Sequence, residues 1–243
     1  MITVITIVIV AAATGLIFLL RKSTERLPFK LLKNSLLDRT LKFQLAQLLL
    51  AFLVLGIIYL KDPENLLTFL GFGNPNALIN PVPWLGITGK ESWLEIAGSI
   101  GFFITLGTAI FMFFQLRRTG STFKDVFLVL PWAVLFSVTN AFSEEAIFRV
   151  GLISPLIDQI SIPAILIISG VMFGLPHYFG QPSGLIGVLM AGFLGWFLAL
   201  SLIETEGVFI AWLIHFVQDV VIITTFLLIN RMKKVEATSA TPG

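Results

Sequence analysis

The chain is organised around one charged stretch, SEEAIFR at residues 143–149, which lies inside an apolar segment, 126–157. Charged side chains so deep in apolar sequence are costly in a bilayer and by default mark a functional site. On a helix, Glu145 and Arg149 are four residues apart with the acid first, which is the favourable order for an ion pair. A buried pair that only fixes helix packing would explain these two charges but not the third, Glu144.

The composition is that of a membrane protein. Of the 243 residues, 56% are hydrophobic and 12% are charged, and the mean hydropathy is +0.95, whereas roughly a quarter of a soluble domain is charged. The absence of cysteine excludes disulfides, a thiolate nucleophile and a cysteine-ligated metal. No Gly-rich phosphate motif and no basic patch interleaved with aromatics occurs, so we expect no nucleic-acid partner and predict a protein of the lipid bilayer.

A membrane-spanning helix needs about 20 mostly apolar residues. This rule predicts an all-α polytopic bundle of about seven transmembrane helices. The expected spans are 2–20, 43–60, 94–116, 131–157, 161–177, 184–203 and 207–230. No basic residues precede the first apolar run, so we interpret it as a span and not as a cleaved signal.

The distribution of lysine and arginine predicts the orientation, because short loops rich in these residues face the cytoplasm. Basic residues cluster after the first span (21–42), after the third (117–124) and after the seventh (231–234), and the alternate loops are poor in them. We therefore expect the N-terminus outside and the C-terminus in the cytoplasm, in the plasma membrane of a prokaryote.

The segments between the expected spans can also be interpreted. Residues 21–42 form either an interfacial amphipathic helix or a plain solvated loop. The loop 61–92 contains four prolines but is too apolar to float free, so we place it against the outer membrane surface. Pro131 suits the first turn of the fourth span, which would leave 122–130 as a short surface helix.

The chain divides by its polar residues into three parts. We expect N-terminal transmembrane helices and loops in 1–120, a catalytic core in 121–232 and a disordered tail in 233–243. The sixth span has small residues at four-residue spacing, a pattern typical of close helix packing: Gly187, Ala191 and Gly195.

Few other ionisable groups lie within spans. The only two histidines are His177, which ends the fifth span, and His215, which lies four residues before Asp219 in the seventh. Alone, a histidine at a helix end is more often a cap, and a His–Asp pair can be a simple hydrogen bond. However, Glu144 and His177 are equidistant from the expected turn between spans four and five, so they lie at the same depth. Asp219 lies about 18 Å along the seventh span at 1.5 Å per residue, near the same level.

This convergence predicts hydrolysis of an amide inside the membrane. A carboxylate and a histidine at one depth can activate a water, with the acid accepting the proton while histidine orients the water or shuttles charge. A second pair can stabilise the oxyanion that forms when water attacks a carbonyl.

The motifs EExxxR (144–149), FxxxH (173–177) and HxxxD (215–219), in this order on three spans, resemble the CPBP family. This family comprises type II CAAX prenyl endopeptidases and bacteriocin-processing or immunity proteins, also called Abi. The resemblance covers about residues 135–225 and implies an all-helical membrane fold with the active site in a cavity. It also implies that Glu144 and His177 activate water, while His215 and position 219 form the oxyanion site.

The resemblance further implies that Glu145 and Arg149 shape the site or bind the C-terminal end of the substrate. Phe173 and Asn140 are expected to support the site. Position 219 departs from the pattern, since it is Asp where prenyl-endopeptidase members have Asn. An ionised Asp219 would repel an oxyanion, so it must be protonated, orient His215 or ligate a metal.

A zinc site is the alternative to a metal-free site. The set Glu144, His177, His215 and Asp219 would suit zinc, but the chain lacks the His-Glu-x-x-His helix of zinc proteases. The family has been described both as metal-dependent and as a metal-free glutamate protease. We favour the metal-free mechanism, without a cofactor.

The resulting hypothesis is an intramembrane endopeptidase that acts on a membrane-associated protein or peptide, with prenylated CAAX-type proteins among the candidate substrates. One alternative is a non-catalytic scaffold or immunity protein of the same family. The other is a proton-coupled transporter that uses Glu144 and the histidines as a relay. The absence of an internal repeat argues against the transporter.

Overall fold

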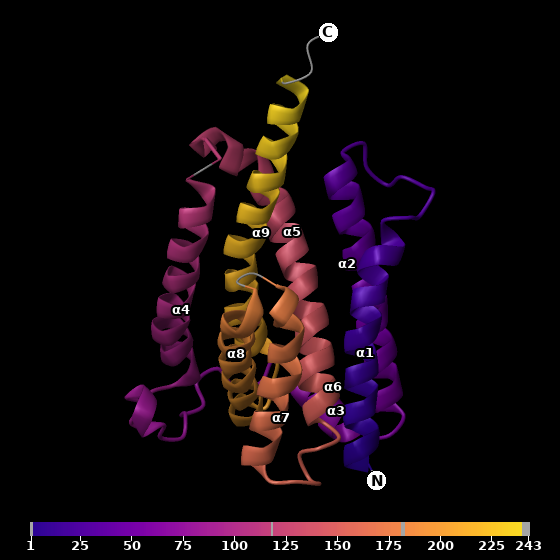
Figure 1. The fold of residues 1–243 in the computed structure, drawn as a ribbon. Coiled ribbons are helices and arrows are strands. Elements are labelled where there is room, and N and C mark those ends of the chain that lie inside the picture. Colours follow the sequence, from indigo (N-terminus) through magenta and orange to yellow (C-terminus); the bar gives the residue numbers. More distant parts are fainter. Residues whose placement is uncertain (1, 118, 181–182, 240–243) are drawn as a thin grey trace.

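The computed structural model describes residues 2–117, 119–180 and 183–239, and within these ranges the protein is an all-helical bundle (Figure 1). Seven of its helices are long and apolar enough to cross a membrane, which confirms the predicted integral membrane protein with seven spans. The main helices of the seven spans are α1 (Ile2–Thr24), α2 (Ser35–Tyr59), α4 (Trp93–Leu116), α5 (Phe123–Glu145), α7 (Ile162–Gly174), α8 (Gly184–Thr205) and α9 (Phe209–Ser239). The fourth span continues beyond α5 to Ile153, and the fifth continues beyond α7 to Phe179. The short elements are α3 (Pro63–Leu70), η1 (Pro83–Leu85), η2 (Ala146–Val150), α6 (Gly151–Ile153) and η3 (Leu175–Phe179).

The second span begins earlier than its apolar residues do. Asn34 caps α2 by accepting hydrogen bonds from the backbone N–H groups of Leu36 and Leu37. In the first turn, Asp38 accepts two backbone N–H groups of the preceding loop, at 2.6 and 2.9 Å, and pairs with Lys42 at 2.8 Å. Because these polar groups are satisfied, the helix extends beyond the apolar segment. We predicted either an amphipathic helix or a loop for 21–42. The structure has a loop at 25–34, and the residues on either side of it belong to α1 and α2.

The fourth span also begins earlier, and the expected surface helix at 122–130 is wrong. The Asp125 carboxylate accepts from the backbone N–H and the hydroxyl of Thr122, at 3.0 and 2.7 Å, and so starts α5 at Phe123. Pro131 therefore lies inside the helix and not in its first turn. Such interior prolines are tolerated in membrane helices because neighbouring groups satisfy the freed backbone.

Directly after Glu145, this helix widens into the π-helical turn η2 and then ends at Ile153, short of the expected residue 157. Single π-helical turns of this kind are frequent at functional sites. The change in winding lies between Glu145 and Arg149, so it determines how these two side chains meet.

Helices α7 and α8 approach each other so closely that only glycine fits at their contact. A Cβ atom on Gly174 would lie 2.7 Å from the carbonyl oxygen of Val188, and one on Gly195 would lie 2.9 Å from the Cβ of Phe173. Of the predicted small-residue face, Gly195 therefore packs against α7, whereas Gly187 and Ala191 line a cavity. This contact fixes the end of α7, which carries two predicted site residues.

The loop 61–92 is fixed to the bundle where α8 joins α9. The Glu204 carboxylate accepts from the indole N–H of Trp93 at 2.9 Å and from the backbone and side chain of Asn80. Gly73 and Gly207 meet backbone to backbone, and a Cβ atom on Gly207 would lie 2.3 Å from the nitrogen of Gly73. The loop therefore closes one end of the bundle.

The start of α1 and the end of α9 lie at opposite ends of the bundle, as an odd number of spans requires (Figure 1). The C-terminal end is shared by the end of α1 and by the α4–α5 connection (Figure 1). Helix α9 continues to Ser239, so part of the expected disordered tail is helical, and 240–243 lie outside the described residues. Because α2 packs on α5 and α4 packs on α9, the N-terminal spans belong to the same bundle as the predicted core.

Candidate active site

The centre of the site is His215, a buried residue of α9 that is surrounded by carboxylates. Its Nδ1 atom is 2.6 Å from Oε1 of Glu145. Its Nε2 atom is 3.6 Å from Oε2 of Glu144 and 3.7 Å from Oδ2 of Asp219. Two helices, α5 and α9, therefore bring three carboxylates to one imidazole.

Glu145 connects this imidazole to Arg149. Oε2 of Glu145 lies 3.1 Å from Nε of Arg149 and both side chains are fully buried, so the predicted ion pair is present. A carboxylate paired in this way can only accept, so Nδ1 of His215 donates to Glu145 and Nε2 remains free to face Glu144 and Asp219. Glu145 thus orients His215, the role that we considered for Asp219, which lies beyond hydrogen-bonding distance of the ring.

A chain of amide side chains holds the other two carboxylates. Nδ2 of Asn140 is 2.9 Å from Oδ2 of Asp219 and 3.3 Å from Oε1 of Glu144. From α2, Gln47 donates to the same oxygen of Glu144, and Gln44 donates to Oδ1 of Asn140, both at 3.4 Å.

Neither glutamine was among the predicted site residues, although both are polar residues within an apolar span. Gln44 and Gln47 are three residues apart and therefore lie on one face of an apolar helix. Polar side chains inside a span seek hydrogen-bonding partners on other helices. This spacing was the signal that could have identified α2 as part of the site.

His177 belongs to η3, at the end of α7. Its Nδ1 atom is 2.7 Å from the carbonyl oxygen of Phe173. Since a carbonyl only accepts, Nδ1 donates, and in the neutral imidazole Nε2 then carries the lone pair. The Phe173 ring lies between the two histidines, with its centroid 4.8 Å from that of His177 and 5.6 Å from that of His215. The guanidinium of Arg149 packs on the same ring, 3.9 Å from its centroid.

The four predicted catalytic residues line two cavities that share His177. Glu144 and His177 line a narrow cavity of about 50 Å³ beside α1. His177, His215 and Asp219 line a cavity of about 300 Å³ between α4, α8 and α9, whose other walls are mostly apolar. In the part of the chain that the structure describes, no hydrogen bond or ion pair joins Glu144 to His177. The two side chains of this predicted pair only line the same narrow cavity.

The arrangement does not fit a zinc site. Among the described residues, no three His, Asp or Glu side chains are placed so that they could hold a metal ion. Nδ1 of His215 is hydrogen-bonded to Glu145 and Nδ1 of His177 to a backbone carbonyl. These hydrogen bonds leave Nε2 of each histidine as its possible ligand atom, but among the described residues Glu144, His177, His215 and Asp219 are not grouped around one point.

Seven apolar helices around a buried cluster of histidines and carboxylates define a polytopic membrane protein with an intramembrane polar site. Residues 126–221, which run from α5 into α9 and contain the whole cluster except the glutamines of α2, match the family Type II CAAX prenyl endopeptidase Rce1-like. This segment is an Rce1-like domain of the CPBP family, a family of intramembrane endopeptidases. Neither a curated protein nor a solved structure matches the chain.

Proposed function

We propose that the protein is an endopeptidase that cleaves a membrane-associated protein or peptide, with prenylated CAAX-type proteins as the first candidates. The observation that carries this proposal is the position of Glu144 and Asp219 beside Nε2 of His215, where a largely apolar cavity meets the site. A substrate carbonyl in this cavity would meet His215, and Glu144, the proposed proton acceptor, lies 3.6 Å from Nε2 of the same imidazole.

In the proposed reaction, Glu144 accepts a proton from water while the Nε2 lone pair of His177 orients it. The water oxygen attacks the carbonyl carbon, and the oxyanion is stabilised by N–H of Nε2 when His215 carries both protons. Glu144 then gives the proton to the amide nitrogen, the C–N bond breaks, and a carboxylic acid and an amine leave. Asn140 and Gln47 hold Oε1 of Glu144, so Oε2 is the oxygen that faces His215.

A reconstituted assay separates this function from its rivals. Purified protein in proteoliposomes is given an internally quenched, farnesylated peptide, and an enclosed pH dye reports proton flux. We expect release of fluorescence without proton flux. Proton flux without cleavage would support the transporter, and the absence of both would support a non-catalytic scaffold.

We propose that the N-terminus lies outside and the C-terminus in the cytoplasm. The basic residues Arg21, Lys22 and Arg117 end α1 and α4 at the same end of the bundle as the C-terminus (Figure 1), and loops of this kind stay in the cytoplasm. A fluorescent or phosphatase reporter fused after Lys234 should report the cytoplasm. An external signal would contradict the orientation.

Exchanging Asp219 for asparagine tests the role of this position. The carbonyl oxygen of Asn can still accept from Asn140, and its amide can donate to an oxyanion without repelling it. We expect Asp219→Asn to retain cleavage within about tenfold of wild type, a barrier change of about 1.4 kcal/mol or less. Asp219→Ala, which removes the shorter of the two hydrogen bonds that Asn140 donates, should lose more activity.

Elemental analysis of the same purified variants tests the metal alternative. We expect no metal at stoichiometric level in wild type or Asp219→Asn. Stoichiometric zinc that disappears together with activity in Asp219→Asn would show that Asp219 is a ligand, because a neutral amide binds zinc less well than a carboxylate.

A further inference from the structure

We propose that Arg21 and Arg39 bind the C-terminal carboxylate of the substrate, at the mouth of a second cavity that leads to Asp219. This inference rests on the proposed endopeptidase function. The second cavity has a volume of about 310 Å³ and lies between α1, α2, α5 and α9. Its mouth is lined by Arg21, Glu25 and Arg39, and its floor by Gln44, Asn140 and Asp219.

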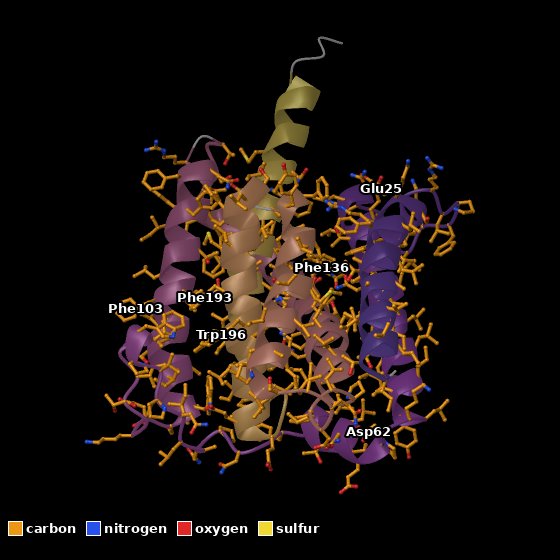
Figure 2. The ribbon with its side chains drawn as sticks, turned by 60° about the horizontal axis from the view of Figure 1, so that its bottom comes forward. Glu25, Asp62, Phe103, Phe136, Phe193 and Trp196 are labelled. Carbon is orange, nitrogen blue, oxygen red and sulfur yellow. The ribbon has the colours of Figure 1, made fainter. Side chains whose placement is uncertain are left out.

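Asp219 lines both of these cavities, and the two differ in chemistry. The first cavity is walled by aromatic and aliphatic side chains, among them Phe103 of α4 and Phe193 of α8, which lie near each other in the view of Figure 2. The second carries two guanidinium groups at its mouth. A substrate with an apolar group on one side of the scissile bond and an anionic group on the other would match the chemistry of both cavities.

Arg149, which by the family resemblance either shapes the site or binds the C-terminal end of the substrate, does not line either cavity. Its side chain is fully buried between Glu145 and the ring of Phe173. A carboxylate that enters the site from the second cavity therefore meets Arg21 and Arg39, not Arg149.

The charges at the mouth are available to a ligand. Arg39 lies 3.9 Å from Glu25, and the two side chains are 50% and 51% exposed. Exposed pairs of this kind contribute little to stability, so a ligand carboxylate can replace Glu25. Guanidinium groups bind carboxylates with two parallel hydrogen bonds, which favours a terminal carboxylate over an amide. Figure 2 shows Glu25 at the end of the bundle opposite Asp62, on the side that we assign to the cytoplasm.

The depth of the cavity limits the length of the bound segment. Arg39 precedes Gln44 by five residues on α2, a rise of about 7.5 Å. Gln44 donates a hydrogen bond to Asn140, which in turn donates hydrogen bonds to Glu144 and Asp219. Because an extended chain spans about 3.3–3.6 Å per residue, two or three residues cover this distance. A segment of this length therefore reaches from Arg39 to the level of Gln44 and Asn140.

The test compares two peptides that differ only at the C-terminus. Proteoliposomes of phosphatidylcholine, a lipid without net charge, receive the quenched farnesylated peptide either as free acid or as C-terminal amide. We expect wild type to show a KM about tenfold lower for the acid, the factor that one charge-assisted contact gives. Arg21→Gln and Arg39→Gln should each narrow this preference, and the double variant should reduce it to less than about twofold.

Lys22→Gln is the matched control, since Lys22 neighbours Arg21 in sequence, loses the same charge and does not line the cavity. It should keep the preference for the acid. Thermal unfolding in detergent should be the same for all these exposed positions, so that a change in KM reports binding and not folding.

Each alternative outcome overturns the inference in a distinguishable way. Equal KM values for acid and amide in wild type, or a preference that survives in the double variant, would refute the proposed carboxylate site. Neither result would contradict the proposed endopeptidase function. Loss of the preference in Lys22→Gln would show a general surface potential. An effect of the variants only in vesicles with phosphatidylglycerol, equal for both peptides, would show a lipid headgroup as the ligand.

Binding without turnover keeps the inference testable if no peptide is cleaved and the proposed function fails. The acid and the amide peptide are then titrated onto the Glu144→Gln protein by thermophoresis. Tighter binding of the acid that depends on Arg21 and Arg39 would support the site. Equal binding of the two peptides would refute it.

Discussion

Replacing Glu144 with glutamine is expected to abolish cleavage and leave the fold intact. Glutamine has nearly the same shape, but it cannot accept the proton of the attacking water, and loss of a general base costs about 10²–10⁴-fold in rate. The amide oxygen of glutamine can still accept the hydrogen bonds from Asn140 and Gln47, so the network around the position should survive. Cleavage of the quenched peptide by purified wild type and variant measures the effect.

The neighbouring residue provides the matched control, because Glu145→Gln makes the same chemical change one position further on. The glutamine oxygen can still accept from Nδ1 of His215, so we expect partial activity. Equal activities in the two variants would contradict the assignment of the base to Glu144, and a loss confined to Glu145→Gln would assign the base to Glu145. Comparing the membrane proteomes of cells with wild type and Glu144→Gln should also reveal the uncleaved natural substrate.

The spans could be predicted because their length and apolar character are dictated by the bilayer. The errors lie where polar side chains extend a helix beyond its apolar segment. Asn34 and Asp38 start α2 within a basic segment, and Asp125 starts α5 ahead of Pro131. Hydropathy does not indicate where polar residues start a helix. The three-residue spacing of Thr122 and Asp125, which are hydrogen-bonded in the structure, was the available sequence signal for the start of α5.

Within the site, contacts along one helix could be predicted and contacts between helices could not. The spacing of Glu145 and Arg149 indicated their ion pair, and Asn140 is four residues before Glu144. The hydrogen bond from His215 to Glu145 depends on the rotation of α9 against α5 and on the π-helical turn that follows Glu145. Residue spacing fixes neither of these.

Replacing Arg149 with alanine is expected to harm folding as well as activity. The guanidinium is fully buried, in ion contact with Glu145 at 3.1 Å and packed on the face of Phe173. Its removal strands the Glu145 carboxylate in the protein interior with His215 as its remaining partner, and breaking a buried pair typically costs about 3–5 kcal/mol. Thermal unfolding of the purified protein in detergent should show a clearly lower midpoint.

A compensating variant separates the lost charge from the lost packing. Arg149→Met combined with Glu145→Gln removes both charges, keeps most of the side-chain volume against Phe173 and retains an acceptor for Nδ1 of His215. Because apolar replacement of a whole buried pair is often neutral or stabilising, this double variant should recover much of the stability that Arg149→Ala loses. A wild-type midpoint for Arg149→Ala would show that the pair is not a buried stabilising contact. A midpoint of the double variant as low as that of Arg149→Ala would instead attribute the loss to the interactions of the guanidinium itself, among them its contact with the Phe173 ring.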